Sequence, residues 1–143
     1  MENSKKTVKV LSYIFYVFAV LDLILIALSI MILCGANVNA SLLGTDADAV
    51  KGTFIAVAIG YAIDFIFTVY LAAKGIRVTN GTIKGKSFLI VALVLLALEV
   101  VAVIANIYFL ATGKGNTTQL ISDAISAACI YLYYTNCKKA IAE

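Results

Sequence analysis

The chain is short, apolar and weakly charged. It has 143 residues, of which 63% are hydrophobic and 13% are charged, whereas a soluble domain has roughly half apolar and about a quarter charged residues. A soluble fold of this length could not bury so much apolar surface, so the composition excludes it and predicts one membrane domain over residues 1–143. The net charge is only +3, and no aromatic residues alternate with the basic ones, which gives nucleic-acid binding no support.

Four long apolar blocks follow one another along the chain. They cover Val10–Leu33, Thr53–Ala73, Ser87–Ala111 and Thr117–Asn136. Each is close to or above the ~20 residues that a helix needs to cross a hydrocarbon core of ~30 Å. Proline is absent, and glycine and polar residues gather between the blocks, as expected for helices that are interrupted only at turns. Because backbone polar groups in lipid need internal partners, we predict an all-α, polytopic bundle of four transmembrane helices.

The first block has an alternative interpretation as the core of a secretory signal. Lys5–Lys9 would be its charged region, and Val38-Asn39-Ala40 would be a weak cleavage site. However, the block exceeds the roughly 7–15 apolar residues of a signal core, and it contains Asp22. We therefore predict that the first block is retained as a span.

Lysine and arginine residues are distributed unevenly between the two sides of the blocks. Nine of the eleven share one side, and Lys51 and Lys114 lie on the other. The nine are Lys5, Lys6, Lys9, Lys74, Arg77, Lys84, Lys86, Lys138 and Lys139. Since basic residues are in excess on the cytoplasmic side, we predict that both termini and the Lys74–Lys86 loop are cytoplasmic. The connections Gly35–Val50 and Gly113–Asn116 would then be exterior, and anionic lipid is an expected partner of the cytoplasmic loop.

The first and third blocks resemble each other at their polar positions. Asp22 in the first block corresponds to Glu99 in the third, and in this alignment Ser29 corresponds to Asn106. This pattern predicts a tandem repeat of two helical hairpins, related by an axis along the membrane normal. Shared apolar composition is the alternative explanation for the similarity.

One carboxylic acid lies near the middle of each block. The four are Asp22, Asp64, Glu99 and Asp123. At ~1.5 Å per residue they lie ~14–20 Å from the inner ends of their spans, so they form a layer near the midplane. Each acid costs roughly 2.5–3.5 kcal/mol on insertion, and no Lys, Arg or His lies in any span. Because carboxylates at low dielectric must be neutralised, we predict that this layer binds protons or small cations.

Neutral polar side chains accompany the acids. The candidate supporting residues are Ser29, Asn106, Thr68 and Ser126. Seven residues separate Asp22 from Ser29 and Glu99 from Asn106, which places each pair on one helix face. In the second block Gly52, Ala56, Gly60, Asp64, Thr68 and Ala72 recur every four residues. This small-residue stripe predicts that another helix approaches closely along the line of Asp64.

Residues for catalysis are not evident in the sequence. It contains no histidine, and neither Ser122 nor Cys129 has a partner base of the expected type. Glu99 is the only glutamate in a block, which does not fit the Glu-x-x-His pairs of di-metal bundles. We therefore predict a protein that is not an enzyme and has no cofactor, and the sequence leaves metal binding open.

Two functions remain open at this stage. The first is transport, by an oligomer whose acidic layer binds protons or small cations and supports their movement across the membrane. The second is a non-transporting accessory or scaffold protein, in which the carboxyls act as interhelical hydrogen-bond glue. The expected partners are the lipid bilayer and either further copies of the chain or another membrane protein.

Overall fold

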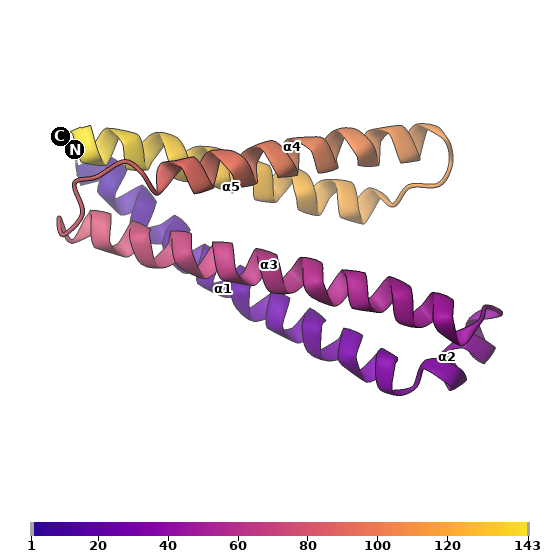
Figure 1. Cartoon of the computed structure of the whole chain (residues 1–143). Coiled ribbons are helices and arrows are strands. Elements are labelled where there is room, and N and C mark those ends of the chain that lie inside the picture. Colours follow the sequence, from indigo (N-terminus) through magenta and orange to yellow (C-terminus); the bar gives the residue numbers. More distant parts are fainter. Residues whose placement is uncertain (1, 143) are drawn as a thin grey trace. The chain divides into compact units, whose positions relative to one another are not determined.

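The computed structural model describes residues 2–142, and the described chain is helical over most of its length (Figure 1). In chain order its helices are α1 (Glu2–Cys34), α2 (Ala36–Leu43), α3 (Ala47–Thr79), α4 (Leu89–Ala111) and α5 (Thr117–Ala142). Four of these helices coincide with the four apolar blocks. The prediction of an all-α fold is therefore confirmed.

Three helices are long and apolar enough to cross a membrane, namely α1, α3 and α4. α1 and α3 have 33 residues each and α4 has 23, so at ~1.5 Å per residue they are ~35–50 Å long. In the most apolar stretch of each helix, only 17%, 11% and 11% of the residues, respectively, are buried. Apolar side chains therefore cover the outer surfaces of these helices, as in a membrane protein.

α5 is long enough to cross a bilayer but is less apolar than the other three. It has 26 residues, and polar side chains such as Gln119, Asp123 and Asn136 interrupt its apolar sequence. Its exposed apolar residues are Ile121, Ile125, Tyr131 and Leu132. Three of the four predicted spans, α1, α3 and α4, are therefore both long enough and apolar enough to cross a membrane. The fourth, α5, is long enough but less apolar.

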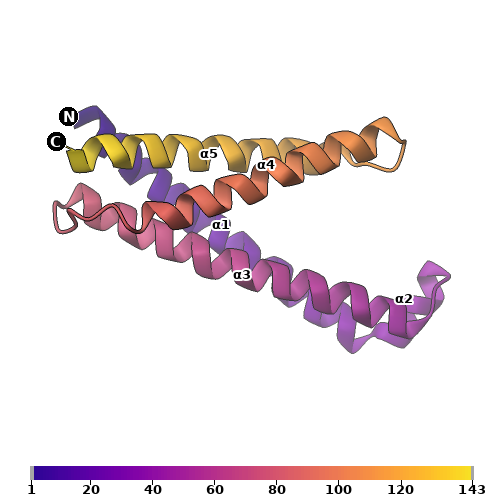
Figure 2. The ribbon, with the colours of Figure 1, turned by 45° about the horizontal axis from the view of Figure 1, so that its top comes forward.

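The segment Ile14–Tyr70 forms one compact unit. In it the longer part of α1 and the first two thirds of α3 lie side by side as a hairpin (Figures 1 and 2). At the turn of this hairpin, Ala36 and Ala40 of α2 pack against Val50 of α3, with Ile32 and Phe54 beside them. This small apolar cluster holds the turn together.

The short helix α2 lies in a connection that we expected to be a turn. Ala36 and Ala40 are one helical turn apart, and both are buried, so α2 has one small apolar face that packs on α3. Gly44 then ends α2 in the left-handed conformation, with φ 67°, which glycine adopts without steric cost. Eight residues with one apolar face are too short a pattern to distinguish from a loop in the sequence.

The described residues of Met1–Tyr13 and Leu71–Glu143 form the second compact unit. Within it α4 and α5 pack along each other as an antiparallel hairpin, and the start of α1 and the end of α3 lie beside α5 (Figures 1 and 2). A Cβ atom on Gly75 would lie 2.8 Å from Cε2 of Tyr133 and would also collide with the hydroxyl of Ser12. Only glycine therefore fits where α1, α3 and α5 meet.

A buried hydrogen bond lies at the same meeting point. The hydroxyl of Tyr133 donates to the backbone oxygen of Leu71 at 2.5 Å, and Tyr133 and Ser12 are both fully buried. We call Ser12, Leu71, Gly75 and Tyr133 the Gly75 junction. Close packing and a bond from α5 to α3 together fix the three helices at this point.

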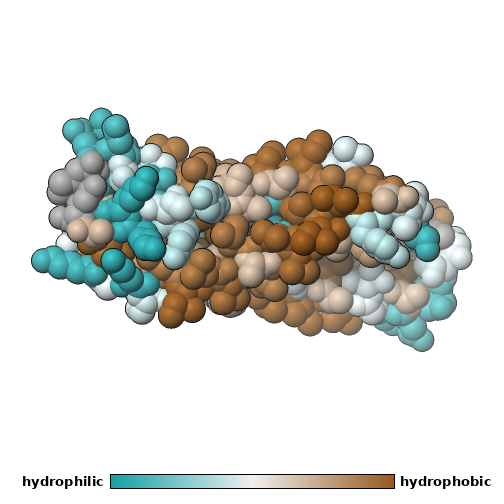
Figure 3. Space-filling model, turned by 90° about the horizontal axis from the view of Figure 1, so that it is seen from above, coloured by the Kyte–Doolittle hydropathy of each residue, from teal (hydrophilic) through white to brown (hydrophobic). Residues whose placement is uncertain are grey.

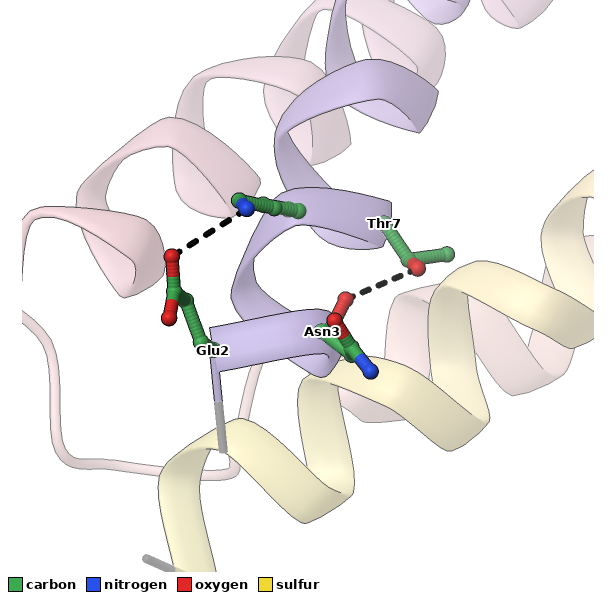
Figure 4. Close-up of polar contacts among 4 residues, drawn as sticks. Glu2, Asn3 and Thr7 are labelled. Atoms are coloured by element: carbon green, nitrogen blue, oxygen red, sulfur yellow. Dashed lines mark hydrogen bonds and ion pairs between the residues drawn. The ribbon is translucent and has the colours of Figure 1, made fainter.

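Polar and apolar residues are separated along the helix axes. Figure 3 shows hydrophilic residues gathered at the helix ends and apolar residues along the helix middles. In the first turns of α1, Lys6 forms an ion pair with Glu2 at 3.1 Å, and the Thr7 hydroxyl donates to the backbone oxygen of Asn3 (Figure 4). The start of α1 is thus an exposed, polar helix end.

Candidate functional site

The four candidate acids are divided between the two compact units. Asp22 of α1 and Asp64 of α3 belong to Ile14–Tyr70, whereas Glu99 of α4 and Asp123 of α5 belong to the other unit. Across residues 2–142, no three His, Cys, Asp or Glu side chains come together in a group that could hold a metal ion. Each unit thus contains two of the four acids.

Asp123 is held by amide groups from both helices of its hairpin. One carboxylate oxygen, Oδ2, accepts a hydrogen bond from Nδ2 of Asn106 in α4. The other, Oδ1, accepts a hydrogen bond from Nε2 of Gln119, one turn earlier in α5, at 3.0 Å. Asp123 and Asn106 are half-buried, and Gln119 is exposed. Both carboxylate oxygens are thus supplied with N–H donors from neutral side chains.

Asn106 bonds across the hairpin. The seven-residue interval predicted only that Asn106 and Glu99 share a face of α4, and the amide of Asn106 donates to Asp123 of α5. Glu99 itself is half-buried, two turns away along α4. Gln119 was not among the supporting residues, although its position four residues before Asp123 is a spacing at which helical side chains meet.

The acid in α1 is the most buried of the four. Asp22 is 6% exposed, and Ser29 on the same face of α1 is 4% exposed. The hydroxyl of Ser29 donates to the backbone oxygen of Leu25 at 2.8 Å, so its one proton is used within its own helix. Ser29 therefore lies on the predicted face but does not donate to Asp22.

The small-residue stripe of α3 is exposed at one end and buried at the other. Gly52, Ala56 and Gly60 are exposed, and a Cβ atom on either glycine would meet nothing within 4 Å. Asp64 is half-buried, and Thr68 is buried at 8% exposure. The outer half of the stripe is thus accessible to lipid or to a helix of another molecule.

Ser126 completes the set of predicted supporting residues. It is half-buried in α5, three residues after Asp123, and so lies nearly one turn further into that helix. The carboxyl and hydroxyl oxygens among these groups can bind a proton or a small cation.

Comparison with known proteins finds no matching family model and no significant match to a curated protein or to a solved structure.

Proposed function

We propose that this chain is a multi-pass membrane protein whose intramembrane carboxyls bind protons or small cations and support their transport. In this proposal α1, α3, α4 and α5 are four spans, and both termini face the cytoplasm. The two hairpins, α1 with α3 and α4 with α5, are the two copies of a tandem repeat, since each helix of each hairpin carries one acid. The nine basic residues on one side support the orientation.

The fourth span of the proposal is α5. Its 26 residues are ~39 Å long at ~1.5 Å per residue. Its carboxyl at Asp123 is bonded to Asn106 of α4, and Ile121 and Ile125 are exposed, at 54% and 53%. A helix whose polar groups are bonded to a neighbouring span while its apolar side chains face outward is suited to lipid despite its lower hydropathy.

The observation that carries the transport proposal is the burial of Asp22 in the middle of an apolar helix. Asp22 is 6% exposed and lies within the apolar part of α1. Ionisable side chains inside a membrane span are costly and mark proton or ion sites by default. Loading and unloading such a group from the two sides of the bilayer is the elementary step of transport.

Transport by four helices alone would leave little room for a pathway, so the proposal includes association of several copies. The exposed half of the α3 stripe supports this arrangement, because small residues let helices in lipid approach closely. Asp64 lies on the same line. Chemical cross-linking of the purified protein measures the association, and Gly60→Leu is expected to reduce it, whereas Ile59→Leu on the neighbouring face is not.

The transport proposal is tested with purified protein in liposomes that contain a pH-sensitive or cation-sensitive dye. We expect a flux driven by a proton or cation gradient, and we expect Asp22→Asn and Glu99→Gln to reduce it to the level of protein-free liposomes. Asp48→Asn, which changes an exposed acid in the first turn of α3, is the control and should leave the flux unchanged. An unaltered flux in both core variants would contradict the proposal.

The second candidate function is that of a non-transporting accessory or scaffold protein. It is favoured by Asp123, whose two oxygens accept hydrogen bonds from Asn106 and Gln119, as expected of interhelical glue. The same liposomes discriminate the two functions. A scaffold gives no flux in the wild-type protein, and its Glu99→Gln variant unfolds at a lower temperature.

A further inference from the structure

Each of the three helices of the Gly75 junction carries a basic residue within five positions of the junction. Lys9 lies three residues before Ser12 in α1, Arg77 lies two residues after Gly75 in α3, and Lys138 lies five residues after Tyr133 in α5. These intervals correspond to ~3–8 Å along the axes. Because α1 starts at this end while α3 and α5 finish there, all three basic residues lie on the same side of the junction (Figures 1 and 2).

The chain adds further positive charge at the same end. Lys84 and Lys86 lie in the connection between α3 and α4, and Lys139 follows Lys138. All these side chains are exposed, as are Lys9, Arg77 and Lys138. We call these six residues the basic collar: Lys9, Arg77, Lys84, Lys86, Lys138 and Lys139. They all belong to one compact unit.

Little negative charge offsets the basic collar. Glu2 is the only acidic residue in the segments 2–13, 71–98 and 124–142. It forms an ion pair with Lys6, one turn along α1, at 3.1 Å (Figure 4). Since Glu2 pairs with a lysine outside the collar, the six collar residues give this end of the unit a strongly positive surface.

A band of tyrosine and apolar residues lies one turn inside the collar. Tyr13 is four residues inside Lys9 and is 55% exposed, and the half-buried Tyr134 is four residues inside Lys138. Ile90 is four residues inside Lys86 and is 64% exposed. Tyrosine is enriched at the level of lipid headgroups, and lysine side chains extend from apolar surface toward the polar layer. The collar is therefore at the height of lipid phosphates when the apolar band lies in hydrocarbon.

We propose that the basic collar binds the phosphate groups of anionic phospholipids in the leaflet that surrounds it. The charges come from four separate exposed segments at one end of the unit, next to its apolar band, and charges spread over several segments match a layer of headgroups and not one small ion. The proposal rests on the proposed insertion into the bilayer, but it does not depend on proton or cation transport. The surface attracts anionic lipid in proportion to its charge and loses this attraction as salt screens it.

The test measures lipid selectivity of the full chain in nanodiscs. Spin-labelled phosphatidylglycerol and spin-labelled phosphatidylcholine report how strongly each lipid associates with the protein. We expect preferential association of phosphatidylglycerol. One surface charge contributes ~1 kcal/mol, which is about fivefold in association. The triple variant Arg77→Gln, Lys84→Gln, Lys138→Gln should therefore reduce the preference for phosphatidylglycerol by a factor of at least about five. High salt should have the same effect in the wild-type protein.

Matched variants separate the collar from general effects of charge and folding. Lys51→Gln with Lys114→Gln removes the two basic residues of the opposite side and should preserve the preference, as should Arg77→Lys, which keeps the collar charge. Equal association of both lipids with the wild-type protein overturns the inference. So does an equal loss in the Lys51 and Lys114 variant, or full competition by inorganic phosphate at millimolar concentration.

Insertion is measured separately by extraction of the membranes with alkaline carbonate. A chain that remains in the membrane but shows no lipid preference overturns this inference alone. A chain that is extracted overturns the proposed function, and the inference with it.

Discussion

The two compact units hold their helices together in different ways. In the unit formed by residues 2–13 and 71–142, three helices are in close contact at the Gly75 junction, and α4 and α5 share the hydrogen bond from Asn106 to Asp123. In the unit Ile14–Tyr70, α1 and α3 are tied at their turn by a small apolar cluster, while Gly52 and Gly60 face open space.

Packing contacts and a buried interhelical bond raise the free energy needed to open the unit of residues 2–13 and 71–142. Exposed helix faces leave the unit Ile14–Tyr70 open to lipid or to another copy. Asp22, the most buried of the four candidate acids, lies in the unit Ile14–Tyr70. In the proposed transport cycle, the more tightly packed unit therefore supports the chain, and the more open unit binds and releases the ion.

The largest predicted difference is in thiol reactivity. Cys137 is fully buried in α5, and a reagent cannot reach a buried thiol until the packing around it opens. Cys34, in the other unit, is exposed. In a Cys129→Ser background, mass spectrometry should find maleimide on Cys34 and not on Cys137.

Denatured protein provides a control for this labelling. Unfolding exposes Cys137, so Cys34 and Cys137 should then react alike. Equal labelling of Cys137 and Cys34 at pH 8 in folded protein would show that the Gly75 junction is not closed.

A second prediction compares a glycine from each unit. Gly75→Ala should lower the free energy of unfolding by about 1–3 kcal/mol, because its Cβ would overlap Tyr133 and Ser12. Gly60→Ala adds a methyl group in open space and should raise the free energy of unfolding by about 0.5–1 kcal/mol, since glycine is a poor helix former. Thermal or detergent-induced unfolding of the purified variants measures both changes. Effects of the same sign would remove the contrast between the units.

A third prediction concerns the buried hydroxyl of the Gly75 junction. Tyr133→Phe removes the donor to the Leu71 carbonyl and should cost about 0.5–1.5 kcal/mol of unfolding free energy. Tyr13→Phe, at a tyrosine that is 55% exposed, is the matched control and should change little. If the two variants are equally stable, the hydrogen bond contributes nothing to the junction.

The smallest predicted effect is the coupling between Asn106 and Asp123. A double-mutant cycle with Asn106→Ala and Asp123→Ala should give a coupling of about 0.6 kcal/mol, and up to about 1.7 kcal/mol, as for hydrogen bonds between other membrane helices. The matching cycle in the other unit, with Ser29→Ala and Asp22→Asn, should give a coupling near zero, because Ser29 donates to Leu25. Similar couplings in the two cycles would contradict the distinction drawn here.

Helix positions could be predicted from the sequence because apolar block length and the lack of proline are local properties. The helix that begins at Thr117 starts at the predicted residue, and α4 begins at Leu89, two residues after the predicted start. α2 was missed because Ala36 and Ala40 reveal their buried face only when Val50 packs on them. Short elements of this kind depend on tertiary contacts.

Contacts between helices could not be derived from spacing within one helix. The seven-residue interval from Glu99 to Asn106 correctly defines a shared direction along α4, but the rotation and height of α5 decide that Asn106 meets Asp123. In the same way, the sequence does not distinguish Gly75 from the other glycines, because its close contacts with Ser12 and Tyr133 form only when the helices pack. The register of one helix against another is a property of the pair.

In the proposed four-span topology, the bonds of Asp123 also bear on how the chain enters the membrane during synthesis. α4 is long and apolar enough to cross a membrane, whereas α5 is long enough but less apolar. Only the short connection 112–116 separates them, so both arms emerge from the ribosome within seconds of each other. Because Asn106 offers a donor to Asp123, we expect the two helices to partition as one preformed hairpin, with α4 carrying its polar companion into the bilayer.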